Sequence, residues 1–503
     1  MHHLRYLHRL SSLPAMAWVL ALLSCIVSGF FVVYLRSRWL FRSLPPGPPG
    51  HWLLGNEIPT KRAFLKYEEW TKAYGPVYSL TRFGKVYVVV GRYDAAVELM
   101  EKGGTQTADR PRAIAASDTF SGGLRSILLN DTPRWRTLNR AFHSHLKTNR
   151  AAAYEPVQLY HAKRMILNIL DNPEKFTTHT KTYAASVILT LTYGKTTPTT
   201  FEDPDLQDMI RDGNRFRVVI LPGAYLVDTF PVLRWVPGYL SELRRWHRDS
   251  IELCRRCLGS VRTKMGGEDV PECFATDLLG NEKMSFDQAA VLTGSMFSAG
   301  ASTTAAALVF VIMAAACFPE AAKVVQREID GVVSRDRCPT FDDRERLPQV
   351  MAFVYECFRW RPLVPSGIAH AASQDILWQG YVIPKGATII ASPWSIFRSP
   401  DIFHSPEDFD PQRWIIDGQV REDIKQFVYG FGRRVCPGSR IANRSLFINT
   451  ALLLWAFDIV ATEKIDSKAF ADEPGMFPGS FGVQFDLRAG KEREDWVRSL
   501  MGK

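Results

Sequence analysis

A single cysteine, Cys436, stands in a glycine-rich loop directly before a segment of helical character. The loop reads Phe-Val-Tyr-Gly-Phe-Gly-Arg-Arg-Val-Cys-Pro-Gly over residues 427–438, and residues 439–457 are predicted to form the helix. Gly432 and Gly438 allow positive φ angles and close approach, so the backbone can wrap around the sulfur. The amides and the dipole at the start of the helix would favour negative charge on the sulfur. The segment therefore predicts a thiolate presented to a metal ion; the alternative is a buried, inert cysteine.

Hydroxyl groups gather in the middle of a second segment, residues 285–318. Ser285 and Gln288 form a capping box that starts a helix, and residues 289–318 carry no charge. A helix that is apolar on all faces either spans a membrane or lies at the centre of a large protein. The turn of residues 299–304, Ala-Gly-Ala-Ser-Thr-Thr, favours the central position, because it widens the groove beside the helix and places donors in an apolar wall. Plain helix packing is the alternative for this turn.

Two further motifs have ordinary structural explanations when each is taken singly. Glu356 and Arg359 place a carboxylate and a guanidinium on one face of a predicted helix, a pair worth only tenths of a kcal/mol if exposed. Cys254 and Cys257 have the spacing of metal ligands, but no second Cys or His pair lies near them in the sequence. We expect both cysteines to lie on one face of a charged helix over residues 240–262.

Taken together and in order, these motifs resemble those of the cytochrome P450 family. The loop around Cys436 resembles the family's haem-binding signature Phe-x-x-Gly-x-Arg-x-Cys-x-Gly, with Tyr429 in place of the phenylalanine. The turn 299–304 resembles the Ala-Gly-x-acid-Thr-Thr motif of the family's central helix. Thr303 matches the threonine that supports proton delivery to oxygen, and Ser302 stands where the family usually has an acid.

The resemblance also assigns a structural network and a cofactor site. Glu356 and Arg359 match the family's Glu-x-x-Arg motif, and Arg413, in Phe-Asp-Pro-Gln-Arg-Trp, matches the arginine that completes the buried network aiming the cysteine. The implied cofactor is haem b (iron protoporphyrin IX), with Cys436 as the axial ligand of the iron. Four residues are expected to bind the haem propionates, although each cation among them could simply be a surface charge: Trp135, Arg140, His370 and Arg434.

The fold implied is mostly α with a small β region, that is, the cytochrome P450 fold preceded by a single N-terminal transmembrane helix. Hydrophobic periodicity predicts helices over residues 93–102, 133–146, 154–170, 240–263 and 319–333. Residues 77–90 predict a β-hairpin with its turn at residues 83–85, and residues 376–390 predict short strands. The apolar, proline-rich loop 221–238 is predicted to be either a lid over an apolar channel or a second contact with a membrane surface.

The sequence pattern predicts that the chain is divided into an N-terminal anchor, a short hinge and a catalytic domain. Residues 1–43 contain an uncharged run of about the 20 residues that a bilayer core requires, followed by interfacial arginine and tryptophan, and are predicted to be a membrane anchor. A cleaved signal peptide is the alternative. Residues 44–50, Leu-Pro-Pro-Gly-Pro-Pro-Gly, would form a stiff hinge, and residues 51–503 the catalytic domain. Resemblance to microsomal family members places the protein in the endoplasmic reticulum membrane, single-pass, with the catalytic domain cytosolic.

The charge and cysteine content of the chain indicate which binding partners and which compartment suit it. The formal net charge is +10, but the cations are spread out and no aromatic-interleaved basic stripe occurs, so nucleic acid is not an expected partner. An acidic protein or an anionic membrane surface would suit the same balance. Eight cysteines scattered through 503 residues argue against a disulfide scaffold and for a reducing compartment. Asn130 and Asn443 match the glycosylation sequon, and because Asn443 lies in the helix predicted after Cys436, a cytosolic location without sugar is the easier interpretation; the sequence does not decide whether either site is modified.

The function implied is that of a haem-thiolate monooxygenase of the fungal natural-product type, which inserts one oxygen atom from O2 into a lipophilic molecule. Electrons would come from NADPH–cytochrome P450 reductase, because the chain has neither a Rossmann glycine fingerprint nor room for flavin domains. A haem-thiolate isomerase or dehydratase, and a non-catalytic haem-binding protein, are the alternatives. The resemblance predicts that five apolar stretches line the pocket: residues 112–124, 221–236, 296–297, 363–367 and 477–481.

Overall fold

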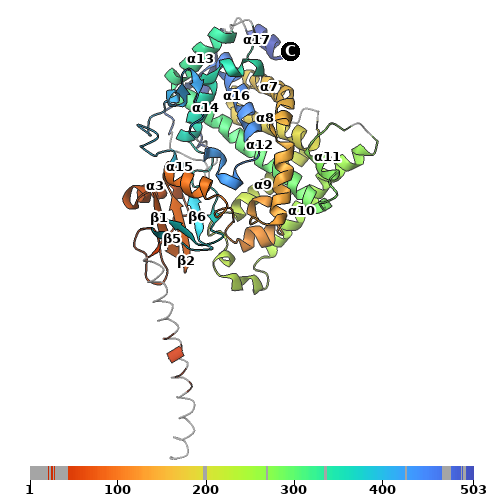
Figure 1. Ribbon diagram of the computed structural model, residues 1–503. Coiled ribbons are helices and arrows are strands. Elements are labelled where there is room, and N and C mark those ends of the chain that lie inside the picture. Colours follow the sequence, from red (N-terminus) through yellow and green to blue (C-terminus); the bar gives the residue numbers. More distant parts are fainter. Residues whose placement is uncertain are drawn as a thin grey trace, which may run out of the picture.

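The computed structural model describes residues 43–195, 201–267, 270–333, 337–424, 427–466, 477–488, 490 and 494–502, together with Trp18, Ala21, Ser24, Cys25 and Ser28. A large helical body lies beside a smaller β-rich part, and the chain enters through the β-rich part at the lower end of Figure 1. Because most of residues 1–43 lie outside the described residues, the predicted anchor stays a prediction.

Helices make up most of the described chain, as the hydrophobic periodicity predicts. The α-helices are α3 (Ala63–Tyr74), α4 (Tyr93–Ala96), α5 (Pro133–His145), α6 (Thr148–Ala153), α7 (Glu155–Asp171), α8 (Phe176–Tyr193), α9 (Pro204–Val219), α10 (Ser241–Met265), α11 (Phe274–Leu279), α12 (Phe286–Cys317), α13 (Pro319–Val333), α14 (Pro348–Trp360), α15 (Pro393–Ile396), α16 (Ser439–Ala456) and α17 (Glu494–Gly502). Shorter 3₁₀ or π turns are η1 (Val97–Lys102), η2 (Ile114–Phe120), η3 (Ser126–Leu128), η4 (Pro173–Lys175), η5 (Leu226–Asp228), η6 (Pro231–Trp235), η7 (Phe341–Arg346), η8 (Pro411–Trp414), η9 (Phe427–Tyr429) and η10 (Gly432–Arg434).

The strands form one four-stranded sheet and three two-stranded ones among the described residues. The strands are β1 (Val77–Arg82), β2 (Lys85–Val90), β3 (His370–Ala371), β4 (Ile376–Trp378), β5 (Tyr381–Ile383), β6 (Thr388–Ala391), β7 (Ile415–Ile416), β8 (Gln419–Val420), β9 (Phe457–Ala461) and β10 (Val483–Leu487). The larger sheet has the order β1-β2-β6-β3, with β2 and β6 parallel and the other neighbours antiparallel.

The predicted hairpin is confirmed, with a tighter turn than expected. Arg82 pairs with Lys85, so that only Phe83 and Gly84 connect β1 to β2. Both connecting residues have positive φ, 48° and 74°, which is the backbone conformation that the right-handed twist of two-residue hairpins favours. Phe83 tolerates this conformation while its half-exposed ring packs against Phe230, with the centroids 5.5 Å apart.

The predicted hinge lies against the catalytic domain. Ser79 on β1 donates its amide to the Pro46 carbonyl at 3.0 Å and its hydroxyl to the Pro45 carbonyl at 2.6 Å. A Cβ on Gly47 would stand 1.9 Å from the Ser79 carbonyl oxygen, so only glycine allows this approach. Residues 45–47 therefore belong to the packed domain.

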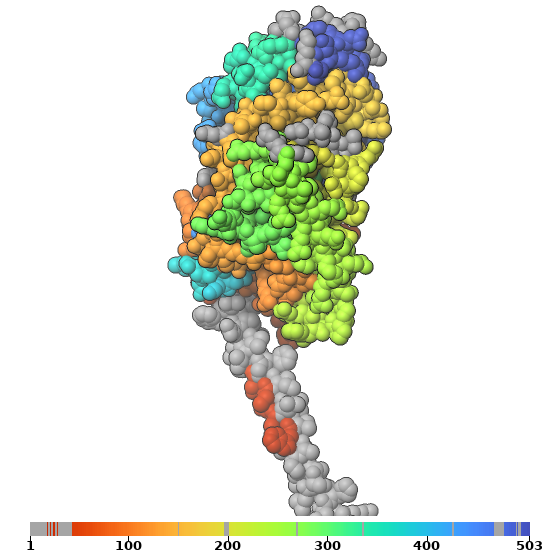
Figure 2. Space-filling view, turned by 90° about the vertical axis from the view of Figure 1, so that its right-hand side faces the viewer, coloured from red at the N-terminus to blue at the C-terminus, as the bar shows by residue number. Residues whose placement is uncertain are grey.

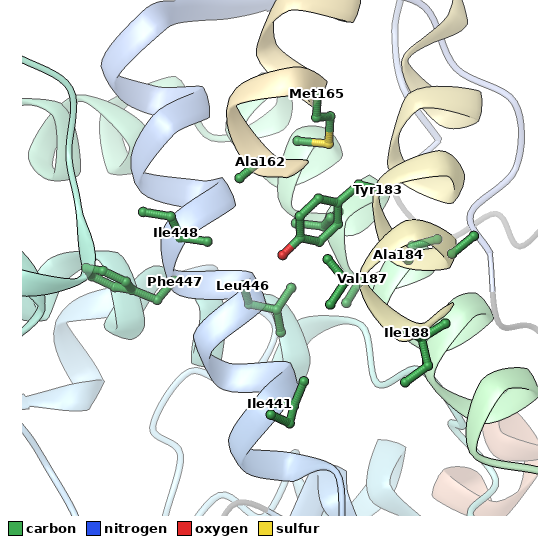
Figure 3. Packing of buried hydrophobic residues seen from close by; sticks show 14 of the residues in the cluster. Ala162, Met165, Tyr183, Ala184, Val187, Ile188, Ile441, Leu446, Phe447 and Ile448 are labelled. Carbon is green, nitrogen blue, oxygen red and sulfur yellow. The ribbon is translucent and has the colours of Figure 1, made fainter. Parts of the chain in front are cut away.

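Helix α12 is the centre of the helical body. Its capping box is formed: the Gln288 amide donates to Ser285 Oγ, and the Gln288 side chain accepts from the Ser285 amide. It is the one helix of the described chain that is long and apolar enough to cross a membrane, yet 72% of its most apolar stretch is buried inside the protein. Helices α8, α10 and α16 pack around it, and Figure 3 shows apolar side chains of α7, α8 and α16 interlocking in this core.

Several segments differ from the sequence-based expectation. The single helix expected over residues 93–102 divides into α4 and the π-helix η1, and the lid 221–238 contains the 3₁₀ turns η5 and η6. Helix α8 was not predicted, because it is apolar around most of its circumference and shows little periodicity. Helices α3, α6, α9, α11, α15 and α17 were not predicted either. Residues 240–262 form α10 as expected, and Cys254 and Cys257 are buried there as free thiols; the described residues contain no cluster of three metal-ligating side chains.

Glu328 on α13 provides a test of the packing between α13 and α14. Burial raises the pKa of Glu328 from 4.5 to about 7, although the Gln349 amide donates to its Oε2 at 2.9 Å. The contribution of this group to stability is therefore fully present below pH 4.5 and is lost as the pH rises through 7. We expect Glu328→Gln to match the wild type in acid and to exceed its free energy of unfolding by about 2 kcal/mol in mild alkali.

The measurement is denaturant unfolding across this pH range. Glu345→Gln, at an exposed position close by, is the matched control and should show no such divergence. If Glu328→Gln differs from the wild type by a constant amount at every pH, the raised pKa is wrong.

Candidate active site

The loop before α16 closes on itself around Cys436. The Cys436 amide donates to the Tyr429 carbonyl at 2.7 Å, and the Arg434 amide donates to the Phe431 carbonyl at 2.9 Å. The Tyr429 hydroxyl donates to Asn443 on α16, so the extra oxygen at this position ties the loop to the helix behind it. Asn443 thus lies on a helix, with its side chain hydrogen-bonded to the cysteine loop.

Cys436 is accessible and at the same time surrounded by protein. Its side chain has substantial exposed surface, yet burial raises the pKa of the thiol. Both statements hold when the sulfur faces a space inside the protein. The amides of Gly438 and Ser439 do point at the sulfur and lower the pKa, as expected for a helix N-terminus, but the loss of solvation outweighs them. A metal ion that binds here must therefore displace the proton.

The middle turn of α12 is more accessible than the helix on either side of it. Residues 289–293 and 296–297 before it and 305–316 after it are buried, whereas residues 298–304 retain accessible surface. Thr303 Oγ1 donates to the Ala299 carbonyl at 2.6 Å, and Ser302 Oγ donates to the Ser298 carbonyl at 2.8 Å. Each hydroxyl keeps its lone pairs free to accept a further hydrogen bond.

Three of the four predicted propionate-binding residues come together. The Arg434 guanidinium lies 4.0 Å from the centre of the Trp135 ring. Its Nε donates to the Ala108 carbonyl and its Nη2 to the Leu129 carbonyl, both at 2.6 Å. The His370 ring is close enough to Arg434 for that charge to lower its pKa. This cluster joins α5, β3 and the cysteine loop.

A second arginine, Arg110, belongs to this cluster and was not predicted. It is buried, and its side chain donates to the carbonyls of Ile127 and Ala369 at 3.0 and 2.7 Å. Burial, followed by the nearby charge of Arg434, lowers the pKa of Arg110 to about 9. In the described part of the chain, neither arginine forms an ion pair with a carboxylate. With 62 Lys and Arg residues and no motif around position 110, the sequence does not single this residue out.

His370 and Arg140 need closer description. His370 Nδ1 lies 2.7 Å from the Thr107 carbonyl, so Nδ1 carries the proton, and burial together with Arg110 lowers the pKa to about 3. The imidazole is therefore neutral in this environment. Arg140 does not join the cluster, because its side chain is exposed. It follows Trp135 by five residues on α5, so the two side chains point in directions about 140° apart around the helix axis, and Trp135 is the buried one.

The predicted network around Glu356 is formed, and its central pair is completely buried. Glu356 accepts Nε and Nη2 of Arg359 at 2.8 and 2.7 Å, and neither side chain has exposed surface. The same carboxylate accepts the Trp414 indole at 2.9 Å and Arg413 Nε at 3.3 Å. Arg359 also donates to the carbonyls of Pro406 and Asp408, which joins α14 to the segment that precedes the cysteine loop.

Two of the predicted pocket-lining stretches lie elsewhere. Met296 and Phe297 are buried in the helical core, because α12 turns them toward its neighbours and exposes the next turn instead. Phe481 packs on Phe176 at 5.5 Å between ring centroids, and Phe477 lies beside Lys181, so both contact the first half of α8. The stretches 112–124 and 221–236 do pack together, in a separate apolar cluster with the start of α10.

Comparison with known proteins agrees with this architecture. The family model for cytochrome P450 matches residues 45–478. Cytochrome P450 monooxygenase 113 of Postia placenta is 46% identical over 460 residues, covering 90% of this chain and 93% of the relative. Cytochrome P450 monooxygenase fogE of Aspergillus ruber is 34% identical over 492 residues, covering 91% and 90%. The chain belongs to the cytochrome P450 family, the monooxygenases whose cofactor is haem b.

The described residues fit haem b on three counts. An accessible thiol faces an interior space, as an axial ligand must. Arg110 is buried and Arg434 is partly buried, and neither forms an ion pair with a carboxylate of the described residues, which suits the anionic propionates of the cofactor, although the charges of Asp131 and Asp109 also act on Arg434. The accessible turn of α12 carries small side chains and hydroxyl groups, which leave room for a flat cofactor beside the helix.

The buried pair of Glu356 and Arg359 leads to a second prediction. Arg359→Ala should lower the free energy of unfolding by about 3–5 kcal/mol, because it leaves a carboxylate buried without its charge partner. Lys323→Ala, which breaks the exposed pair with Glu320, is the matched control and should change it by about 0.5 kcal/mol or less. Thermal or denaturant unfolding measures both, and equal losses in the two variants would show that burial does not make the difference.

Proposed function

We propose that this chain is a haem-thiolate monooxygenase that inserts one oxygen atom from O2 into a lipophilic small molecule, in secondary-metabolite biosynthesis. The observation that carries the proposal is the accessible thiol of Cys436 in a closed loop next to Arg110 and Arg434, two cations that form no ion pair with another described residue. Cys436 would hold the iron of bound haem through its sulfur, and Arg434, Arg110 and Trp135 would hold the propionates. Bound haem supplies the oxidising chemistry, which the thiolate assists by donating electron density.

His370 has a conditional part in this site. Its neutral state follows from burial and from the charges of Arg110 and Arg434. An anion bound between these arginines would offset their charge and favour the protonated imidazole, which could then donate through Nε2. The propionates and His370 would therefore stabilise each other.

Thr303 and Ser302 would handle the protons that oxygen activation requires. Both hydroxyls lie on the accessible turn of α12, and their hydrogen bonds to the carbonyls of Ala299 and Ser298 fix their orientation. A hydroxyl held in this way can pass its proton on and accept another. Ser302 lacks the acidity of a carboxylate, so Thr303 is the principal relay and Ser302 a weaker one.

The electron donor is proposed to be NADPH–cytochrome P450 reductase. Two exposed cations lie on neighbouring helices: Arg140 on α5 and Arg440 at the start of α16, directly after the cysteine loop. Burial and then the charge of Arg440 lower the pKa of His143 on α5, so the two helices are close at this point. These cations would meet an acidic face of the reductase. Arg433 is a poorer candidate than its sequence position indicates, because it is paired with Asp131 at 2.7 Å.

The proposed membrane attachment combines the anchor in residues 1–43 with an exposed apolar patch, defined here as Trp52, Leu53, Leu54, Phe83, Phe230, Val232 and Trp235. The Phe83 amide donates to the Leu54 carbonyl at 3.0 Å, and the Phe83 ring packs on Phe230, so three separate stretches form one surface. Both the chain entry and residues 221–238 lie at the lower end of the molecule in Figures 1 and 2. Such a surface suits contact with lipid, in the endoplasmic reticulum membrane with the catalytic domain cytosolic.

The axial ligand gives the third prediction. Cys436→Ala should abolish the thiolate-type spectrum of the reduced carbonyl complex, because the buried Cys254 and Cys257 lie on α10 and cannot replace it. Cys254→Ala is the matched control and should retain the spectrum. A thiolate-type spectrum that persists in Cys436→Ala would overturn the proposed function.

The fourth prediction concerns Thr303. Thr303→Ala should retain haem and substrate binding but divert electrons to hydrogen peroxide, so that product formed per NADPH falls by roughly a hundredfold, the lower end of the range for one proton-transfer group. Ser302→Ala should act in the same direction but less. Ser295→Ala, which removes a hydroxyl bonded in the same way two turns earlier, is the control.

Product, peroxide and NADPH are counted together with the reductase present. Coupling that stays unchanged in both variants would remove the hydroxyls from the mechanism, and turnover without NADPH consumption would favour a haem-thiolate isomerase or dehydratase. No NADPH oxidation with any such reductase would exclude the proposed electron donor.

The fifth prediction concerns the membrane. Removing residues 1–43 should release much of the protein from membranes while haem binding persists, because the packed domain begins at Leu44. Val232→Ser with Trp235→Ser should reduce the remaining association, whereas Tyr160→Ser, an exposed ring on α7, should not. Vesicle flotation measures this, and complete loss of haem on truncation would place the anchor inside the fold.

A further inference from the structure

A strap, defined here as residues 97–110, contacts both β3 and the cysteine loop of the proposed haem site. The Thr107 carbonyl accepts from His370, and the Ala108 carbonyl accepts from Arg434 Nε. The Ala371 amide donates to the Asp109 carbonyl at 2.8 Å. The strap begins with the π-helix η1, a geometry that is rare and frequently found at functional sites.

The strap meets the cysteine loop at Gly432. Gly432 has a φ of +48°, and a Cβ there would stand 2.4 Å from the Met100 carbonyl oxygen, so the two backbones touch. The Gly432 amide donates to Glu101 Oε1 at 2.7 Å. By contrast, the amides of Gly430, Arg434 and Cys436 donate to carbonyls of the loop itself.

Gly432 by itself gives the backbone of this turn little preference for one conformation. It populates positive and negative φ about equally, so the peptide plane before Gly432 has little intrinsic preference. A hydrogen bond to an ionised carboxylate is shorter and roughly twice as strong as one between neutral groups. Glu101 therefore supplies the conformational preference that the glycine lacks, and Cys436 lies only four residues further on.

We propose that Glu101 is a positioning residue for Cys436. Its carboxylate fixes the Gly432 amide and thereby the direction in which the loop presents the sulfur. The inference rests on the proposed function, since it assumes that Cys436 ligates the haem iron. Glu101 itself touches neither substrate nor cofactor in this proposal; it acts through the loop.

The test uses the full-length haem protein in three variants. Glu101→Ala removes the acceptor, whereas Glu101→Gln keeps an oxygen that can accept from Gly432. Glu98→Ala is the matched control: Glu98 lies on the same π-helix, and its carboxylate accepts the Trp378 indole at 2.8 Å instead of a loop amide. The readout is the reduced carbonyl spectrum at equal haem content, together with the rate at which the thiolate-type signal converts to the thiol type.

We expect Glu101→Ala to convert roughly tenfold faster than the wild type, in keeping with the loss of one charge-assisted hydrogen bond. Glu101→Gln, whose neutral oxygen accepts a hydrogen bond of roughly half the strength, should convert only roughly threefold faster than the wild type, and Glu98→Ala should resemble the wild type. The proposal is overturned if Glu101→Ala keeps the wild-type rate, if Glu98→Ala converts equally fast, or if Glu101→Gln behaves like Glu101→Ala. Failure of the proposed function is distinguishable, because then the wild type itself would show no thiolate-type spectrum.

Discussion

The carboxylate of Glu356 has no contact with solvent, and the frame around the cysteine loop depends on it. It accepts hydrogen bonds from Arg359, Arg413, Trp414 and the Asp410 amide, which come from α14 and from the segment that leads to the loop. A buried ion pair contributes little net stability relative to apolar packing, but it severely penalises any arrangement that separates the partners. The network thus restricts the chain to one geometry behind Cys436.

The cluster around Arg434 follows the opposite electrostatic principle. Around Glu356 the charges are matched within the protein, whereas Arg110 and Arg434 share a buried region without a carboxylate partner among the described residues. Their guanidinium groups donate to backbone carbonyls, which satisfy the hydrogen bonds, and Asp131 and Asp109 offset only part of the charge of Arg434 from a distance. The charges around Glu356 are therefore matched within the protein, whereas an anionic ligand would be stabilised beside Arg110 and Arg434.

The sequence predicted those parts of the site that depend on residues close together in the chain. This holds for the cysteine loop, the capped central helix and the Glu356–Arg359 pair, each of which lies within one short stretch of sequence, so that spacing and resemblance locate them. The contacts of Arg110 and Glu101 could not be predicted, because each depends on loops that are far apart in the chain. Arg140 and Met296 were misplaced for a related reason: a motif gives the helix, but the packing of neighbouring helices decides which face is buried.

The contact between Gly47 and Ser79 has a consequence for how substrate reaches the protein. Because residues 45–47 are packed on β1, the chain leaves the domain in a fixed direction, at the end that carries the exposed apolar patch. In the proposed membrane-bound form, the domain could not swing freely above the lipid. A lipophilic substrate would then transfer laterally from the bilayer, and its effective concentration would be set by its partition coefficient rather than by its solubility in water.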